Sequence, residues 1–226
     1  MNIHDLKIEK NIIINRNDAL IIVDMQYDFM PGGVLPVEEG DQIIEMINIL
    51  GEKFSKKNAY IILTQDWHPQ NHLSFASNHP NKNPGDEYQT DGIGPVLWPD
   101  HCVQGTKGAS FHNKLKTHYA KAIFKKGLDP ETDSYSAFRD QLKDKETGLR
   151  EYLISLKIIR FFICGLALDY CCYYTAMDGI EFDFDVYFLI DLTRGVDLPK
   201  GSISKALNDM KKKGVKFVKH DKFSII

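Results

Sequence analysis

The sequence predicts a single-domain α/β fold, an open, mostly parallel β-sheet of about six strands with helices on both faces. Two observations carry this prediction. Short apolar runs recur without the polar alternation of half-exposed strands, and stretches with helical spacing lie between them. With 226 residues, 43% of them hydrophobic, the chain can fill one large core or two small ones. Because it has no internal repeat, low-complexity block or linker, residues 1–226 are treated as one domain.

The predicted strands are short runs rich in apolar and β-branched residues. They occupy 19–24, 60–66, 121–126, 158–165, 184–191 and 214–220. Apolar residues at helical spacing predict helices over 41–57, 147–157, 170–179 and 200–213. One face of the first helix carries Ile43, Met46, Ile47, Leu50 and Phe54. Residues 1–17 precede the first strand as an N-terminal extension.

Residues 67–118 interrupt the alternation of strands and helices. The segment is rich in Asn, Pro, Gly and His and shows no clear hydrophobic period. Loops of this length in a compact domain usually have a function. We therefore expect this long loop to carry metal-binding and substrate-binding residues.

Charge and cysteine usage limit the classes of partner. A net charge of −3 gives no electrostatic reason to expect nucleic acid or an anionic membrane, and favours a small soluble ligand. The N-terminus lacks the apolar region of a signal peptide, and no segment is long enough to span a bilayer. The four cysteines show no CxxC spacing, so neither a disulfide framework nor a structural zinc cluster is expected. These features predict a reducing, cytoplasmic location.

Titratable residues follow the ends of the predicted strands, where ligands bind in an open parallel sheet. Asp24 ends the first strand, Lys126 ends the third, and Cys171 follows the fourth in the first turn of the next helix. Each alone has a simpler explanation, as a turn cap, a solvated lysine or a small buried thiol. Together they form a nucleophilic set in which the helix dipole and Lys126 favour a thiolate and Asp24 carries the proton.

A metal site is predicted at the end of the second strand. Asp66 and His68 are two residues apart, so their side chains point the same way. A third ligand must come from the long loop, which offers His72, His79 and His101. His101 is preferred because it lies in a rigid Trp-Pro stretch. Two histidines and a carboxylate suit zinc, iron or manganese, and zinc is the first choice.

Five motifs, in order along the chain, carry a resemblance to a known family. They are IIVDMQYDFMPGGVLPV, DWHPQNHLSFA, LWPDHCVQGTKGASFH, KKGLDPETDSYSAF and CGLALDYCCYYTAMDG. With them the chain resembles the nicotinamidase/pyrazinamidase branch of the isochorismatase-like cysteine hydrolases from residue 18 onward. The resemblance implies the fold of that family and hydrolysis of nicotinamide to nicotinate and ammonia through a cysteine thioester in NAD salvage. It also implies activity on pyrazinamide.

The resemblance implies roles for particular residues. The catalytic residues of the family fall on Asp24, Lys126 and Cys171, and its metal ligands fall on Asp66, His68 and His101. The residues that wall its substrate pocket fall on Phe29, Trp98 and Tyr135. Its backbone oxyanion donors fall on Ala167 and Cys171. The metal would hold the ring nitrogen of the substrate. His72 is a ligand in some members and lies outside the coordination shell in others, so it stays an alternative. Members have a cis peptide at the position of Leu166–Ala167.

The chain departs from the family pattern in three places. Tyr170 stands where many members have histidine, Cys172 where an aliphatic residue is usual, and the 77–96 insertion is long.

Two other functions stay open. One is another isochorismatase-like amide or ureido hydrolase, although those relatives generally lack the Asp-x-His motif. The other is a catalytically silent binding protein, against which the intact catalytic set argues. The oligomeric state is also open, with a homo-oligomer as one alternative.

Overall fold

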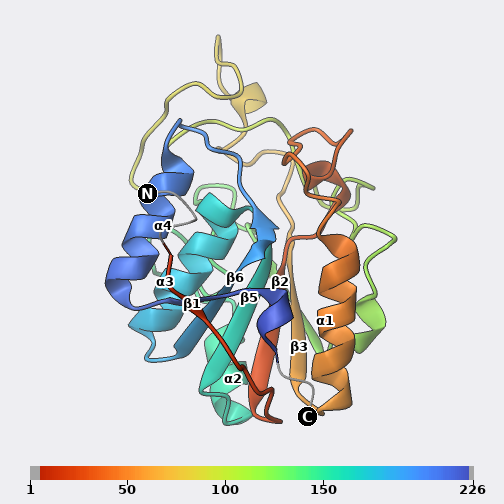
Figure 1. Ribbon diagram of the computed structural model, residues 1–226. Helices are drawn as coiled ribbons and strands as arrows, with labels where there is room; N and C mark the ends of the chain where they lie inside the picture. The colour runs from red at the N-terminus through yellow and green to blue at the C-terminus, as the bar shows by residue number, and fades with distance from the viewer. Residues whose placement is uncertain (1–5, 224–226) are drawn as a thin grey trace.

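The computed structural model describes residues 6–223 and contains one seven-stranded sheet in which all neighbouring strands are parallel (Figure 1). The strands are β1 (Ile8–Glu9), β2 (Asp18–Val23), β3 (Tyr60–Asp66), β4 (Ala122–Lys126), β5 (Arg160–Leu166), β6 (Asp185–Arg194) and β7 (Lys216–Val218). Their order across the sheet is β1-β7-β6-β5-β2-β3-β4. Residues 1–5 of the expected N-terminal extension lie outside the described residues.

Helices cover both faces of the sheet. They are α1 (Ile44–Lys56), α2 (Leu149–Ser155), α3 (Tyr173–Glu181) and α4 (Ser202–Lys213). Alternate residues of β2 point to opposite faces, so that Ile21 packs in the core with α2, α3 and α4 while Ile22 packs in the core with α1. Because both faces are covered, the strands are continuous apolar runs. The predicted fold class is therefore confirmed, and the ends of the six predicted strands agree within three residues.

The sheet has seven strands rather than about six because β1 lies within the stretch taken as an extension. Ile8 and Glu9 pair in parallel with Phe217 and Val218 of β7, and Leu6 is buried in the core. A strand of two residues is too short to show a hydrophobic period. The sequence pattern therefore could not predict it.

The centre of the sheet is a topological switch point. β2 and β5 are neighbours, and the chain continues outward from them in opposite directions, to β3 and β4 on one side and to β6 and β7 on the other. Ligands of open parallel sheets bind beyond the carboxyl ends of the strands at such a point. Much of segment 67–118, drawn in yellow and yellow-green, lies at that end in Figure 1.

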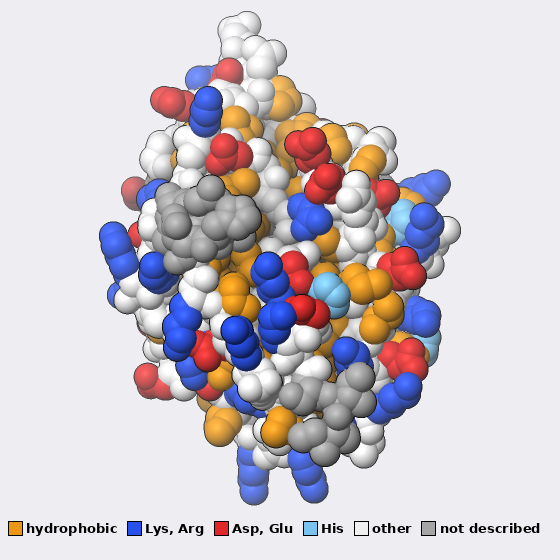
Figure 2. All heavy atoms as spheres, viewed as in Figure 1, with side chains coloured by type: hydrophobic (Ala, Val, Ile, Leu, Met, Phe, Trp, Pro, Cys, Tyr) orange, Lys and Arg blue, Asp and Glu red, His pale blue; other side chains and the backbone are white. Residues whose placement is uncertain are grey.

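The surface and the cysteines agree with the composition. On the face seen in Figure 2, basic and acidic side chains are scattered among one another. All four cysteines are free thiols, and all four are buried. Within residues 6–223, the helices are too short or too polar to cross a membrane.

Candidate active site

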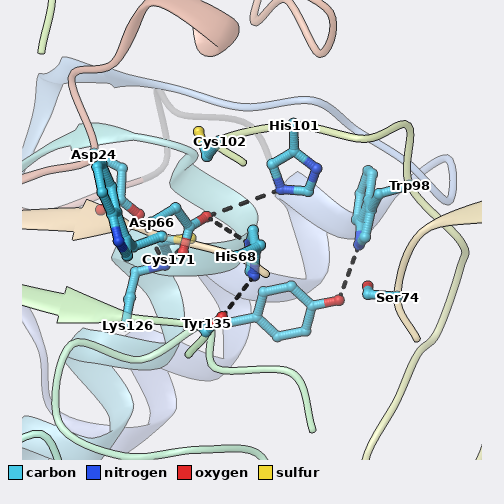
Figure 3. A network of polar contacts seen from close by, with 12 residues as sticks. Asp24, Asp66, His68, Ser74, Trp98, His101, Cys102, Lys126, Tyr135 and Cys171 are labelled. Carbon is cyan, nitrogen blue, oxygen red and sulfur yellow. Dashed lines mark hydrogen bonds and ion pairs between the residues drawn. The ribbon is translucent and has the colours of Figure 1, made fainter. Parts of the chain in front are cut away.

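The buried ammonium group of Lys126 contacts two carboxylates and one thiol at the carboxyl ends of the strands (Figure 3). Nζ lies 2.9 Å from Asp24 Oδ2, 2.5 Å from Asp66 Oδ1 and 3.2 Å from Cys171 Sγ. All four residues are buried, and each is at most 5% exposed. The structure thus brings the three predicted catalytic residues together. It adds Asp66, which the sequence analysis had assigned to the metal site alone.

Backbone geometry explains how two of these side chains reach the cluster. Neighbouring residues of a strand point to opposite faces, and Lys125 Nζ lies 3.5 Å from the centre of the Trp67 ring while Lys126 is buried. Asp24 follows β2 with φ at +47°, and its Oδ1 accepts a hydrogen bond of 2.6 Å from Thr64 Oγ1. Thr64 could not be predicted as part of the site, because a threonine within a strand gives no functional signal.

Lys126→Ala is expected to slow alkylation of Cys171 by about tenfold at neutral pH, because the ammonium group stabilises the thiolate. Lys125→Ala is the matched control, and its packing on Trp67 predicts a change of less than about twofold. The rate of iodoacetamide modification measures both. Equal effects from the two variants would contradict the strand register seen here.

Cys171 lies in a π-helical turn, Leu168–Cys172, and α3 begins only at Tyr173. Cys171 was expected in the first turn of the next helix; it lies in the helical turn that leads directly into α3, and this turn is π-helical. Cys171 lines a cavity, whereas Cys172 is fully buried in the hydrophobic core. The two adjacent thiols thus differ as expected from their positions along a helical turn. The peptide Leu166–Ala167 is cis, as the resemblance implied.

Burial governs the protonation of the cluster. Burial raises the pKa of the Cys171 thiol well above its usual value. Lys126 lowers this pKa, and the carboxylates of Asp24 and Asp66 offset part of that effect. Burial also raises the pKa of Asp24, against the attraction of Lys126. Lys126 lowers the pKa of the Cys171 thiol, as expected, but burial outweighs its effect, so the expectation of a lowered net pKa is corrected. The nucleophile therefore forms by transfer of the thiol proton to a base.

The predicted metal ligands Asp66, His68 and His101 converge, with one ligand atom from each lying within 4.8 Å of the others. Asp66 Oδ2 lies 3.5 Å from His68 Nε2 and 3.9 Å from His101 Nε2. The Nδ1 atoms of the two histidines lie 3.0 Å from Gly127 O and 2.8 Å from Pro99 O. Those hydrogen bonds assign the ring protons to Nδ1 and leave both Nε2 lone pairs directed toward Asp66.

Electrostatics also suit these residues to a metal ion. Burial lowers the pKa of His101 to about 3, which keeps the ring neutral as metal ligation requires. Burial opposes ionisation of Asp66, but Lys126 and His68 hold the pKa of its carboxyl well below the usual value. A carboxylate and two imidazoles are a donor set that fits a divalent transition metal.

The other two histidines considered as ligands are placed differently. His72 is buried with its ring 4.6 Å from that of His68, but its Nδ1 accepts a hydrogen bond of 3.1 Å from Ser74 N. Because burial lowers the pKa of His72 to about 3, the neutral ring carries its proton on Nε2, which then has no lone pair for a metal. His79 Nε2 lies 2.7 Å from Leu73 O.

We expect the purified protein to carry about one divalent metal per chain, and His101→Ala to lose it, because two ligands do not hold a catalytic metal. His79→Ala is the control and should keep the metal. Elemental analysis after purification without chelator measures both. Full turnover in a strong chelator by a metal-free protein would contradict the assignment.

A cavity lies beside the nucleophile and the metal ligands. Cys171 and Ala167 line one part of it, and the predicted wall residues Phe29, Trp98 and Tyr135 line others. The sequence analysis did not assign several further lining residues, namely Leu35, Val37, Ser74, Asp133, Ser134 and Val196, nor Tyr170 beyond noting its departure from the family. They come from segments far apart in the sequence, so only the folded chain brings them together.

Hydrogen bonds fix two of the aromatic walls. Trp98 Nε1 donates to the Tyr135 hydroxyl at 3.1 Å (Figure 3). This hydroxyl lies 3.0 Å from Gly94 O and 3.2 Å from Asp133 Oδ2. Asp133 Oδ2 also accepts a hydrogen bond of 2.8 Å from Gly94 N. These bonds hold the Trp98 and Tyr135 rings at the edge of the cavity.

Asp133→Asn is expected to flatten the pH dependence of stability in weak acid. Burial raises the pKa of Asp133 from 3.8 to about 6, so between these values the native state binds more protons than the unfolded state. The free energy of unfolding should therefore fall by about 3 kcal/mol as pH rises through this window. Denaturant unfolding of both proteins at several pH values measures this, and identical slopes would contradict it.

The fold and the cluster at its switch point together define the class of isochorismatase-like α/β proteins. Residues 18–222 match the isochorismatase domain model, and the chain belongs to this family. The nicotinamidase of Acinetobacter baylyi is 44% identical over 199 residues, which cover 88% of this chain and 91% of that protein.

Two solved structures show the same similarity. PnC1 of L. infantum in complex with nicotinate has a TM-score of 0.82 and 36% identity, over 95% of this chain and 98% of that one. The pyrazinamidase of Pyrococcus horikoshii in complex with zinc has a TM-score of 0.73 and 39% identity, over 90% of this chain and 99% of that one.

Proposed function

We propose that the protein is a nicotinamidase that hydrolyses nicotinamide to nicotinate and ammonia in NAD salvage, and that it also accepts pyrazinamide. The observation that carries the proposal is the contact of Lys126 Nζ with Cys171 Sγ and Asp24 Oδ2, beside a cavity with aromatic walls. Similarity to a nicotinamidase over 88% of the chain supports it, as does the nicotinate complex of the L. infantum relative.

The first half of the reaction forms a thioester. Sγ of Cys171 lies within 4.8 Å of an Asp24 carboxylate oxygen, which takes the thiol proton as the sulfur attacks the amide carbon. The developing oxyanion accepts hydrogen bonds from the backbone N–H groups of Ala167 and Cys171. Asp24 then gives its proton to the amide nitrogen, the C–N bond breaks, and ammonia leaves.

The second half releases nicotinate. Asp24, again ionised, removes a proton from water as the water oxygen attacks the thioester carbon. The C–S bond breaks and the proton returns to the sulfur, which restores the Cys171 thiol. The ammonium group of Lys126, which lies 3.2 Å from Sγ, stabilises the transient thiolate.

Asp66, His68 and His101 would hold the divalent metal, with zinc as the first choice and iron or manganese as alternatives. When bound, the metal would supply a position for the ring nitrogen of the substrate and so orient the carboxamide toward Cys171. The zinc complex of the Pyrococcus horikoshii relative supports zinc. Phe29, Trp98 and Tyr135 would pack on the substrate ring.

The proposal includes the cellular setting. The net charge of −3 and the mixed surface charge of Figure 2 favour a small molecule as the partner, without nucleic acid or membrane. The four free thiols favour a reducing compartment, the cytoplasm. A homo-oligomer stays an alternative.

Ammonia release from nicotinamide tests the proposal, with nicotinate identified by chromatography. The purified protein loaded with zinc should turn over nicotinamide at a rate far above that of an N-carbamoyl amine at equal concentration. Hydrolysis of the carbamoyl compound alone would assign the chain to another activity of the family. If the protein turned over neither compound, the result would support a catalytically silent binding protein.

A further inference from the structure

Segment 195–202, between β6 and α4, forms one wall of the active-site cavity. Val196 lines this cavity together with Cys171. The segment also borders a second cavity, lined by Pro199, Lys200 and Tyr173 among others. Val196 packs against both hydrophobic cores, whereas residues 198–200 are exposed, so packing restrains only part of the segment. Hydrogen bonds provide further restraint.

Asp169 supplies most of these bonds. Its carboxylate is buried and accepts hydrogen bonds from Val196 N at 3.0 Å, Asp197 N at 2.9 Å and Ser202 Oγ at 2.5 Å. Gly195 permits this approach, because a Cβ atom there would lie 2.8 Å from Asp169 Oδ1. One carboxylate thus holds both ends of the wall segment.

The same helical turn carries the nucleophile. Asp169, Tyr170 and Cys171 are consecutive in the π-helical turn, and the Tyr170 hydroxyl donates a further hydrogen bond to Leu198 O. The residues that precede the nucleophile therefore bind the wall that faces it. A change in these bonds would alter the distance between Val196 and a substrate attached to Cys171.

We propose that Asp169 is a positioning residue that fixes Val196 against the cavity and so sets substrate affinity and the size of ring accepted. The inference rests on the proposed function. Asparagine cannot replace the carboxylate, because its single oxygen accepts from one of the two backbone N–H groups while its NH₂ group faces the other. Asp169→Asn should therefore release one backbone group of the wall.

Asp169→Asn is expected to raise the KM for nicotinamide about tenfold while kcat changes less than about threefold. Hydrogen exchange of the amides of 195–198, followed by mass spectrometry, should become faster. Val196→Ala should raise KM similarly. In the double variant, the increase should be smaller than the product of the two single effects, because both act on the same contact.

Asp18→Asn is the matched structural control. Asp18 is buried at the amino end of β2, and its carboxylate accepts hydrogen bonds from Asn15 N at 2.7 Å and Arg160 Nε at 2.8 Å. Its loss should lower Tm and leave KM unchanged. If Asp169→Asn fails to fold, Ser202→Ala removes one bond to Asp169 and should raise KM about twofold.

Three results would overturn the inference. They are an unchanged KM in both Asp169→Asn and Ser202→Ala, an equal KM increase in Asp18→Asn, or fully multiplicative effects of Asp169→Asn and Val196→Ala. Lack of ammonia release by the wild-type protein would instead refute the proposed function. The wall would then be tested by alkylation of Cys171. Asp169→Asn, or Ser202→Ala, should increase the rate with a bulky maleimide relative to iodoacetamide, and an unchanged ratio would overturn the inference.

Discussion

Cys171→Ala is expected to abolish nicotinamide hydrolysis, with a loss of at least about 10⁴-fold, because the nucleophile that forms the thioester is removed. Cys172→Ala should keep most of the activity. Cys172 is fully buried in the hydrophobic core, so its truncation should cost about 1 kcal/mol of stability instead. Ammonia release and denaturant unfolding of both variants measure these effects.

The comparison of the adjacent thiols is informative because both are buried and both have a raised pKa. Only their surroundings in the fold distinguish them. Cys171 lies 3.2 Å from Lys126 Nζ and lines the cavity. Strong loss of activity in Cys172→Ala, with retention in Cys171→Ala, would move the nucleophile and the oxyanion donors by one residue.

Asp24→Asn is the second change with a large expected effect, a loss of about 10³-fold or more in kcat. An amide can neither accept the thiol proton nor deliver one to the leaving nitrogen. Metal content should be unchanged, because Asp66, His68 and His101 remain. Steady-state kinetics and elemental analysis of one preparation measure both quantities.

The alternative explanation of Asp24, a cap of the turn after β2, predicts the opposite outcome. The variant would then lose stability and keep its turnover. Thr64→Val is a useful companion, since it keeps the Asp24 carboxylate but removes the 2.6 Å hydrogen bond to Oδ1 and the 3.2 Å bond that Thr64 Oγ1 accepts from Asp24 N. It should reduce kcat by about tenfold, less than the loss of the carboxylate itself.

Much of the sheet could be predicted because its strands are buried on both faces and stand out as apolar runs. The same runs fixed where the strands end, and so placed Asp24, Asp66 and Lys126 at one edge before their distances were known. The short β1 could not be predicted, because its pairing with β7 depends on residues at the other end of the chain.

The supporting side chains of the site were harder to find. Thr64 binds Asp24 across 40 residues of sequence, and Asp169 binds backbone groups 27 and 28 residues away. Such contacts have no local pattern. The direction of the pKa shift of Cys171 also depends on burial, which outweighs the influence of Lys126 and is a property of the folded chain.

The central claim is that nicotinamide is hydrolysed through a thioester on Cys171. Mass spectrometric peptide mapping of protein quenched with acid during turnover tests it most directly. The account predicts a nicotinoyl group on the peptide that contains Cys171, located on that sulfur by fragmentation and lost on treatment with hydroxylamine. An acyl group located on Cys172 or another residue, or full turnover without any acylated peptide, would contradict it.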